Sequence, residues 1–119
     1  MVEDYKQLRI WQQSIELAKL VYVLADLLPD KERYGLRSQL TRAVVSVASN
    51  IAEGSRRKTT KDLIHFLTIA FGSLAETETQ IIIAIEVGLL PRDKCDAAFE
   101  KINQLAPGLI KLKQNLEKK

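Results

Sequence analysis

The sequence predicts an all-α protein, an antiparallel up-down-up-down four-helix bundle that assembles as a homo-oligomer. Apolar residues recur at alternating spacings of three and four in four segments, as they do along the buried face of a helix. Most of the five Gly and three Pro lie between these segments. No stretch alternates apolar and polar residues as a strand does. The 119 residues suffice for one core, so we expect a single domain over residues 1–119.

The first two expected helices each carry one apolar seam. The first seam consists of Leu8, Trp11, Ile15, Ala18, Tyr22 and Ala25. Pro29 stops this helix, because a residue before proline is disfavoured in the α conformation. The second seam consists of Leu36, Leu40, Ala43, Val47 and Ile51. At its end we expect Gly54 to take the left-handed conformation that closes many helices.

The third and fourth expected helices are the longer pair. The third begins after Thr59-Thr60, with Asp62 in a capping arrangement, and ends near Gly88. Its seam consists of Leu63, Leu67, Ala70, Leu74, Thr77, Ile81 and Ala84. The fourth opens at Pro91, and its seam consists of Cys95, Ala98, Ile102, Leu105, Leu109, Leu112 and Leu116. Within it, Pro107 removes a backbone donor, and we expect a kink or a break there.

Two stretches carry more apolar side chains than one seam needs. At about 100° per residue, three consecutive isoleucines point in three directions, so one subunit leaves some of them in water. We therefore expect an oligomer interface, and the alternative is a broad core stripe with a few exposed isoleucines. The candidate interface residues are Val44, Val45, Ile82, Ile83 and Ile85. On the third helix, Gly72-Ser73 indicates a close contact with another helix.

The residues offer little to an enzyme. His65 is the single histidine and Cys95 the single cysteine, and most of the third expected helix separates them. A di-iron bundle needs two Glu-x-x-His motifs, and the chain has one Asp62-x-x-His65. No glycine-rich nucleotide loop is present. We expect no catalytic residue, no metal and no cofactor, and we expect Cys95 to be a small core residue.

The compartment expected from the sequence is the cytoplasm. One cysteine forms no intrachain disulfide, which fits a reducing compartment. The first residues show no secretory signal. The longest apolar run, residues 81–85, is far shorter than the roughly twenty residues that a bilayer requires, so we expect no membrane partner.

Charge is unevenly distributed along the chain. The net charge is +3, but residues 31–61 contain eight basic and two acidic residues. Phosphate contact with RNA or DNA is one interpretation of this block. The other is that Arg56, Arg57 and Lys58 cap the preceding helix, pair with Glu53 or Asp62 and keep a turn soluble. The candidate nucleic-acid-binding residues are Arg37, Arg42, Arg56, Arg57, Lys58 and Lys61.

Four segments resemble a known family. They are residues 8–13, residues 34–43, residues 46–54 with the sequence Ser-Val-Ala-Ser-Asn-Ile-Ala-Glu-Gly, and residues 66–76 with Gly-Ser-Leu-Ala-Glu at their end. Together they resemble the bacterial four-helix bundle proteins encoded by intervening sequences in 23S ribosomal RNA genes, historically labelled S23 ribosomal proteins. The resemblance covers nearly the whole chain.

The resemblance implies a homopentamer without catalytic activity. Relatives include the accessory protein of diversity-generating retroelements, a basic barrel thought to bind nucleic acid and a reverse transcriptase. Arg42 and Arg56 match basic positions that recur in the family. We therefore expect a non-enzymatic oligomer that binds RNA or another nucleic acid through a basic surface. The alternative is an oligomeric scaffold that recruits a partner enzyme through apolar and acidic surfaces, such as residues 62–104, whose net charge is −4.

Overall fold

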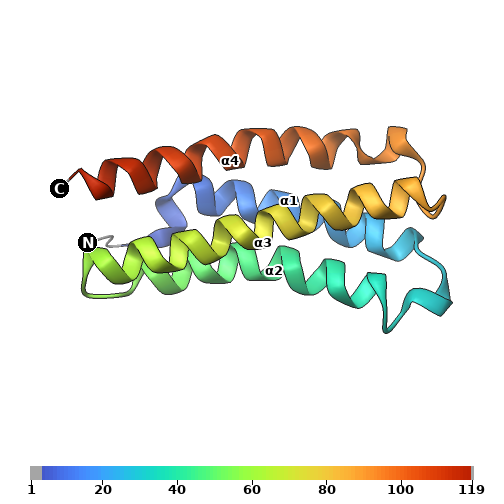
Figure 1. The fold of residues 1–119 in the computed structure, drawn as a ribbon, viewed down its shortest axis with the longest axis horizontal. Helices are drawn as coiled ribbons and strands as arrows, with labels where there is room; N and C mark the ends of the chain where they lie inside the picture. Colours follow the sequence, from blue (N-terminus) through green and yellow to red (C-terminus); the bar gives the residue numbers. More distant parts are fainter. Residues whose placement is uncertain (1–3, 119) are drawn as a thin grey trace.

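The computed structural model describes residues 4–118 as four α-helices joined by short connections (Figure 1). The helices are α1 (Arg9–Leu27), α2 (Leu36–Ser55), α3 (Thr60–Glu86) and α4 (Asp96–Glu117). Short 3-10 helices precede α1, α2 and α4, at Tyr5–Gln7, Asp30–Glu32 and Arg92–Cys95. No strand occurs among these residues, which confirms the prediction of an all-α protein with four helices. The expected domain limits at residues 1 and 119 lie outside the described residues.

Each helix packs against two others. α1 and α3 both contact α2 and α4, and the most extensive contact joins α2 to α3. Figure 1 shows each helix running back along the preceding one, in a body of 46 × 24 × 20 Å. The start of α1, the α2–α3 turn and the end of α4 therefore lie at one end of the bundle, and the other two connections lie at the opposite end.

The core of α1 differs from the predicted seam by a rotation of the helix. The buried residues are Ile10, Ser14, Leu17, Val21, Leu24 and Ala25. Of the predicted seam only Ala25 is buried, Tyr22 is exposed, and the others are half-buried. Because Ser14 is polar, a search for regularly spaced apolar residues does not find the buried seam. Its hydroxyl donates to the Trp11 carbonyl, so the buried polar group is paired. The predicted seams of α2, α3 and α4 are confirmed, with Leu36 and Leu112 half-buried.

Gly54 does not close α2 as predicted. The only residue with positive φ among residues 4–118 is Gly88, which follows α3. Gly54 is helical and buried, and a Cβ placed on it would lie 2.7 Å from the Phe66 Cβ of α3. Gly54 is therefore needed for the close approach of α2 and α3. A Cβ placed on Gly72, by contrast, would have nothing within 4 Å, so the predicted close helix contact at this glycine is absent from the subunit.

α4 continues through Pro107 without the predicted break. Pro107 and Asn103, whose carbonyl loses its helical partner, are both exposed, so water can bond this carbonyl. The next residue, Gly108, faces α1, and its Cβ would lie 2.9 Å from Ile10 Cγ2. Proline thus faces solvent while glycine lets α4 approach α1. At the start of α3, the Thr59 hydroxyl accepts a hydrogen bond from the Asp62 amide, as the capping pattern predicts.

Candidate nucleic-acid interface

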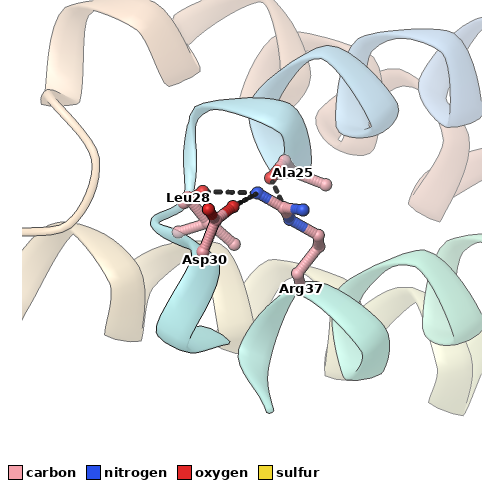
Figure 2. A network of polar contacts seen from close by, with 4 residues as sticks. All are labelled: Ala25, Leu28, Asp30 and Arg37. Carbon is pink, nitrogen blue, oxygen red and sulfur yellow. Dashed lines mark hydrogen bonds and ion pairs between the residues drawn. The ribbon is translucent and has the colours of Figure 1, made fainter. Parts of the chain in front are cut away.

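The predicted binding residue Arg37 has a structural role in this subunit. Its guanidinium group bonds the end of α1: Nε donates to the Ala25 carbonyl at 3.1 Å, and Nη2 donates to the Leu28 carbonyl at 2.6 Å (Figure 2). Asp30 Oδ1 lies 3.9 Å from the same Nη2. A helix leaves its last carbonyls without intrahelical partners. Arg37 supplies the donor to the Leu28 carbonyl and a second donor to the Ala25 carbonyl, which also accepts from the Leu28 amide. This side chain is therefore not free to contact phosphate.

Arg56 and Arg57 follow a different pattern at the other end of α2. The guanidinium carbon of Arg56 lies 5.4 Å from the ring centroid of Tyr5, and that of Arg57 lies 4.7 Å from the ring of Phe66. Arg57 also pairs with Glu53 at 3.4 Å. Both arginines remain exposed. The predicted pairing with Glu53 is confirmed for Arg57, while the ring contacts orient both guanidinium groups at the surface.

The bundle gathers basic residues from three segments at one end. Lys58 and Lys61, in the α2–α3 turn and the first turn of α3, are exposed and form no ion pair within residues 4–118. The first residues of α1 and the last two turns of α4 lie at this same end (Figure 1). We call it the basic end, with Lys6, Arg9, Arg56, Arg57, Lys58, Lys61, Lys111, Lys113 and Lys118.

The composition of the basic end differs from that of the charged block seen in sequence. Within the part of the chain that the structure describes, four acidic residues accompany the nine basic ones, namely Asp4, Glu53, Asp62 and Glu117. The block over residues 31–61 is split by the fold, because Lys31, Arg33 and Arg37 lie at the opposite end. The lysines of α4 take their place. Because these lysines lie far from residues 31–61 in the sequence, a charge sum along the chain does not group them with that block. The arrangement of the four helices brings them to the same end of the bundle.

Arg42 lies apart from the basic end, in the first half of α2. With Gln39, Ala43 and Ser46 of α2, and Glu76 and Gln80 of α3, it lines a hollow of about 280 Å³, here called the α2/α3 pocket. Arg42 and Glu76 are exposed and form no ion pair with each other. The segments on which the family resemblance rests supply five of the six lining residues.

A polar network adjoins this pocket. The hydroxyl groups of Ser46 and Ser73 lie 2.8 Å apart and join α2 to α3. Asn50 Nδ2 donates to the Ser46 carbonyl at 2.8 Å and to the Ser46 hydroxyl at 2.9 Å. Asn50 therefore bonds within its own helix. Gln80 is only 8% exposed, and its Oε1 has no hydrogen-bond partner within residues 4–118.

The candidate interface residues do not share one surface. Val44 is fully buried in the subunit core, because the buried face of α2 is broad enough to include it, and it has no surface left for a second copy. Ile85 is half-buried against the same core. Val45, Ile82 and Ile83 are 44%, 45% and 46% exposed. These three carry the expected unpaired apolar surface.

Two apolar faces lie on opposite sides of the bundle. On the α1/α2 side, the half-buried Trp11 and Ile15 continue to the exposed Tyr22. Val45 shares a face of α2 with Arg56, eleven residues on, and Arg56 contacts Tyr5, which contacts Trp11. We call this the α1/α2 face. On the opposite side, Phe71 and Ile110 line a groove of about 300 Å³ between α3 and α4.

The groove between α3 and α4 extends along α3. Ile82 lies three helical turns beyond Phe71, on the same side of the helix. We call Phe71, Ile82 and Ile110 the α3/α4 face. In the bundle, α1 packs extensively against α2 and α4 but not against α3. The outer surfaces of the α1/α2 pair and of the α3/α4 pair therefore point in opposite directions.

The residues able to carry chemistry lie apart. His65 is exposed on α3 and contacts the Phe66 ring, while Cys95 is fully buried, as predicted for a core residue. Burial raises the pKa of the Cys95 thiol, and the neighbouring Asp96 carboxylate adds to this shift. Over residues 4–118, no three His, Cys, Asp or Glu side chains are grouped to hold a metal. In the same range, no helix is long and apolar enough to cross a bilayer.

Comparison with known proteins gives the family. The model of the 23S rRNA-intervening sequence protein family matches residues 6–111. The chain belongs to this family. A crystal structure of a protein of unknown function from the S23 ribosomal protein family of Bacteroides thetaiotaomicron VPI-5482 has the same fold, with a TM-score of 0.79 and 22% sequence identity. The match covers 88% of this chain and 95% of that chain. No curated protein matches this chain.

Proposed function

We propose that this member of the 23S rRNA-intervening sequence protein family is a non-enzymatic homo-oligomer that binds RNA or another nucleic acid through its basic end. The observation that carries the proposal is the gathering of nine basic and four acidic residues, among those described, at one end of the bundle. Phosphate contacts need positive charge and no base-specific geometry. Lys58 and Lys61, without ion pairs among the described residues, are the most available of these charges.

The two apolar faces support the oligomer in this proposal. Because they lie on opposite sides of the bundle, the α3/α4 face of one copy meets the α1/α2 face of the next. Such head-to-tail contacts close into a ring when the rotation allows it, and the family resemblance favours five copies. A ring places every basic end on one rim, and the repeated charge strengthens phosphate binding.

Titration of RNA and duplex DNA at two salt concentrations tests the nucleic-acid part. We expect wild-type affinity to fall steeply with salt, and Arg56→Ala/Arg57→Ala/Lys58→Ala to bind at least about tenfold more weakly with a shallower salt dependence. The matched control is Lys31→Ala/Arg33→Ala/Lys94→Ala, which removes the same charge from the opposite end. Equal loss in both triple variants, or wild-type binding that does not depend on salt, contradicts the proposal.

Light scattering on two charged variants tests the oligomer. Val45→Lys and Ile82→Lys each damage one face and leave the other intact. In a head-to-tail assembly each variant alone is a monomer, and an equimolar mixture forms a heterodimer through the two intact faces. A monomeric wild type at micromolar concentration contradicts the oligomer. A variant that still assembles alone shows that its substituted face is not in the interface.

A second candidate function is a scaffold that recruits a partner enzyme. The groove between α3 and α4 supports it, with the partner in place of a second copy on Phe71 and Ile110, which are 39% and 44% exposed there. Binding of a protein partner at this groove would be abolished by Phe71→Lys and unaffected by the Arg56, Arg57 and Lys58 substitutions. The opposite dependence is expected of the nucleic-acid function.

A further inference from the structure

The α2/α3 pocket contains a buried acceptor without a donor. Gln80 Oε1 is the one buried side-chain nitrogen or oxygen in residues 4–118 that has no hydrogen-bond partner. An unpaired buried polar atom destabilises a native protein, so such an atom calls for a partner. The hydroxyl groups of Ser46, which lines the pocket, and Ser73 bond each other, and Asn50 bonds Ser46. No group in residues 4–118 supplies the missing donor.

The pocket also presents opposite charges on its two walls. Arg42 of α2 and Glu76 of α3 both line it, and neither forms an ion pair within residues 4–118. Glu76 and Gln80 are four residues apart, which places them one above the other on the same face of α3. A ligand in the pocket thus meets the guanidinium group of Arg42 on the α2 wall, and the carboxylate of Glu76 and the carboxamide of Gln80 on the α3 wall.

This arrangement matches the hydrogen-bonding edges of guanine. Arginine pairs with the O6 and N7 acceptors of guanine through two N–H groups. The N1–H and N2–H₂ groups on the adjacent edge are donors, which a carboxylate accepts. A second N2–H then remains for the Gln80 carboxamide oxygen, whose terminal torsion is soft enough to turn it toward a ligand. Adenine offers N6–H₂ in place of O6 and lacks both donors on the other edge.

We propose that the α2/α3 pocket binds a guanine base, with Arg42 on its O6/N7 edge, Glu76 on N1–H and N2–H, and Gln80 on the second N2–H. The volume of about 280 Å³ suits one base and is too small for a whole helix of RNA. Base pairing hides the N1–H and N2–H₂ edge, so the base comes from a single strand or from a free nucleotide. Where the guanine belongs to an RNA strand, the inference rests on the proposed function: the phosphates bind at the basic end and one base binds in the pocket.

Equilibrium titrations with four probes test this pocket. The probes are GMP, AMP, a short single-stranded oligoribonucleotide with one guanosine among uridines, and the same oligonucleotide with adenosine in its place. We expect the guanosine oligonucleotide to bind about tenfold more tightly than the adenosine one, since one bidentate base contact gives about that discrimination. Arg42→Gln and Glu76→Gln should each abolish the preference and leave the salt dependence at the basic end in place.

Matched control variants separate a loss of binding from a loss of folding. Arg42 and Glu76 are exposed, so their substitutions leave the core intact. Arg33→Gln, in the connection before α2, and Glu78→Gln, two residues along on another face of α3, remove the same charges at residues that do not line the pocket. Both controls should keep the full preference for guanosine. Gln80→Met should lose part of the preference while its thermal unfolding midpoint stays at or above that of the wild type.

Each outcome decides between the two proposals. Equal binding of both oligonucleotides, with no preference for GMP over AMP, overturns the guanine site and leaves salt-dependent nucleic-acid binding standing. A preference for GMP without any binding of RNA supports the pocket as a free-nucleotide site and overturns the proposed function. If Gln80→Met changes the oligomeric mass and no probe discriminates guanine, a second copy supplies the missing donor and the inference is wrong.

Discussion

The two ends of the bundle use arginine in opposite ways. At the end formed by the α1–α2 and α3–α4 connections, Arg37 turns inward and donates to the Ala25 and Leu28 carbonyls. At the basic end, Arg56 and Arg57 lie over aromatic rings with their charges in solvent. All three residues belong to α2 or its immediate end. Their partners, not their residue type, determine whether the charge stabilises the fold or is available to a ligand.

This difference locates stability and binding in separate parts of the molecule. The Arg37 guanidinium group is difficult to remove, because the Leu28 carbonyl would then be left without a donor. One that lies on a ring at the surface contributes little to stability. Substitution of Arg37 should therefore destabilise the protein, and substitutions at the basic end should weaken binding with little effect on stability.

Arg37→Ala should give the largest loss of stability. It removes two charge-assisted hydrogen bonds and leaves the Leu28 carbonyl without a donor, while the Ala25 carbonyl keeps the Leu28 amide, for an expected loss of about 3 kcal/mol. Urea denaturation measures it, and Arg37→Lys should recover only part of the loss because a single ammonium group does not reproduce the two-nitrogen contact. A loss below about 1 kcal/mol would place Arg37 with the surface arginines and remove the contrast between the ends.

Gly54→Ala should follow, with a loss of about 1–2 kcal/mol. The added methyl group would lie 2.7 Å from Phe66 Cβ, so α2 and α3 must separate near the basic end, and the gain in helix propensity offsets only part of this cost. Gly72→Ala is the matched control. Nothing lies within 4 Å of its Cβ position, and we expect it to stabilise the subunit by about 0.5–1 kcal/mol. Chemical denaturation of both variants provides the comparison, and a stabilised Gly54→Ala would contradict the packing described for α2 and α3.

Arg57→Ala should cost less than about 1 kcal/mol. It removes an exposed ion pair with Glu53 and a contact with the Phe66 ring, each of small value at the surface. The same urea denaturation series measures it, with Arg57→Lys separating the charge from the planar contact. If Arg57→Ala destabilised the protein as much as Arg37→Ala, the arginines of the basic end would be structural as well.

Cys95 should produce the smallest effect, as a dependence of stability on alkaline pH. Burial raises the pKa of its thiol above the ordinary value of 9.0, so the unfolded chain loses the proton first as pH rises. The contribution of the neutral thiol is therefore present below the unfolded pKa and declines from there through the folded pKa. The free energy of unfolding of the wild type should fall relative to Cys95→Ala between about pH 8 and pH 10. Parallel curves for the two proteins would show that the thiol ionises equally in both states.

Much of this fold follows from apolar spacing, and the exceptions have physical causes. The seams of α2, α3 and α4 are regular, whereas a paired serine in the core of α1 shifts the apparent seam to Trp11 and Ile15. Pro107 predicts a break in the helix only as long as the side of α4 on which it lies is unknown. On the solvent side of α4 its lost hydrogen bond is taken up by water, so the helix continues.

The candidate site was less accessible to sequence reasoning, because distant segments form it. The basic end combines the α2–α3 turn with lysines of α4, and a charge sum along the chain separates them. Arg37 has the same charge as Arg56, and only the contact with the Leu28 carbonyl distinguishes its role. Gln80 resembles a surface glutamine in sequence. Its burial without a partner depends on how closely α2 and α3 pack.

The contact between Tyr5 and Trp11 gives the protein an intrinsic optical probe. Trp11 is the single tryptophan, and its ring centroid lies 5.4 Å from that of Tyr5, the ring on which Arg56 rests. A ligand that draws Arg56 away changes the surroundings of this aromatic pair. The indole emission of the unlabelled protein therefore reports events at the basic end and is insensitive to those at the opposite end of a body 46 Å long.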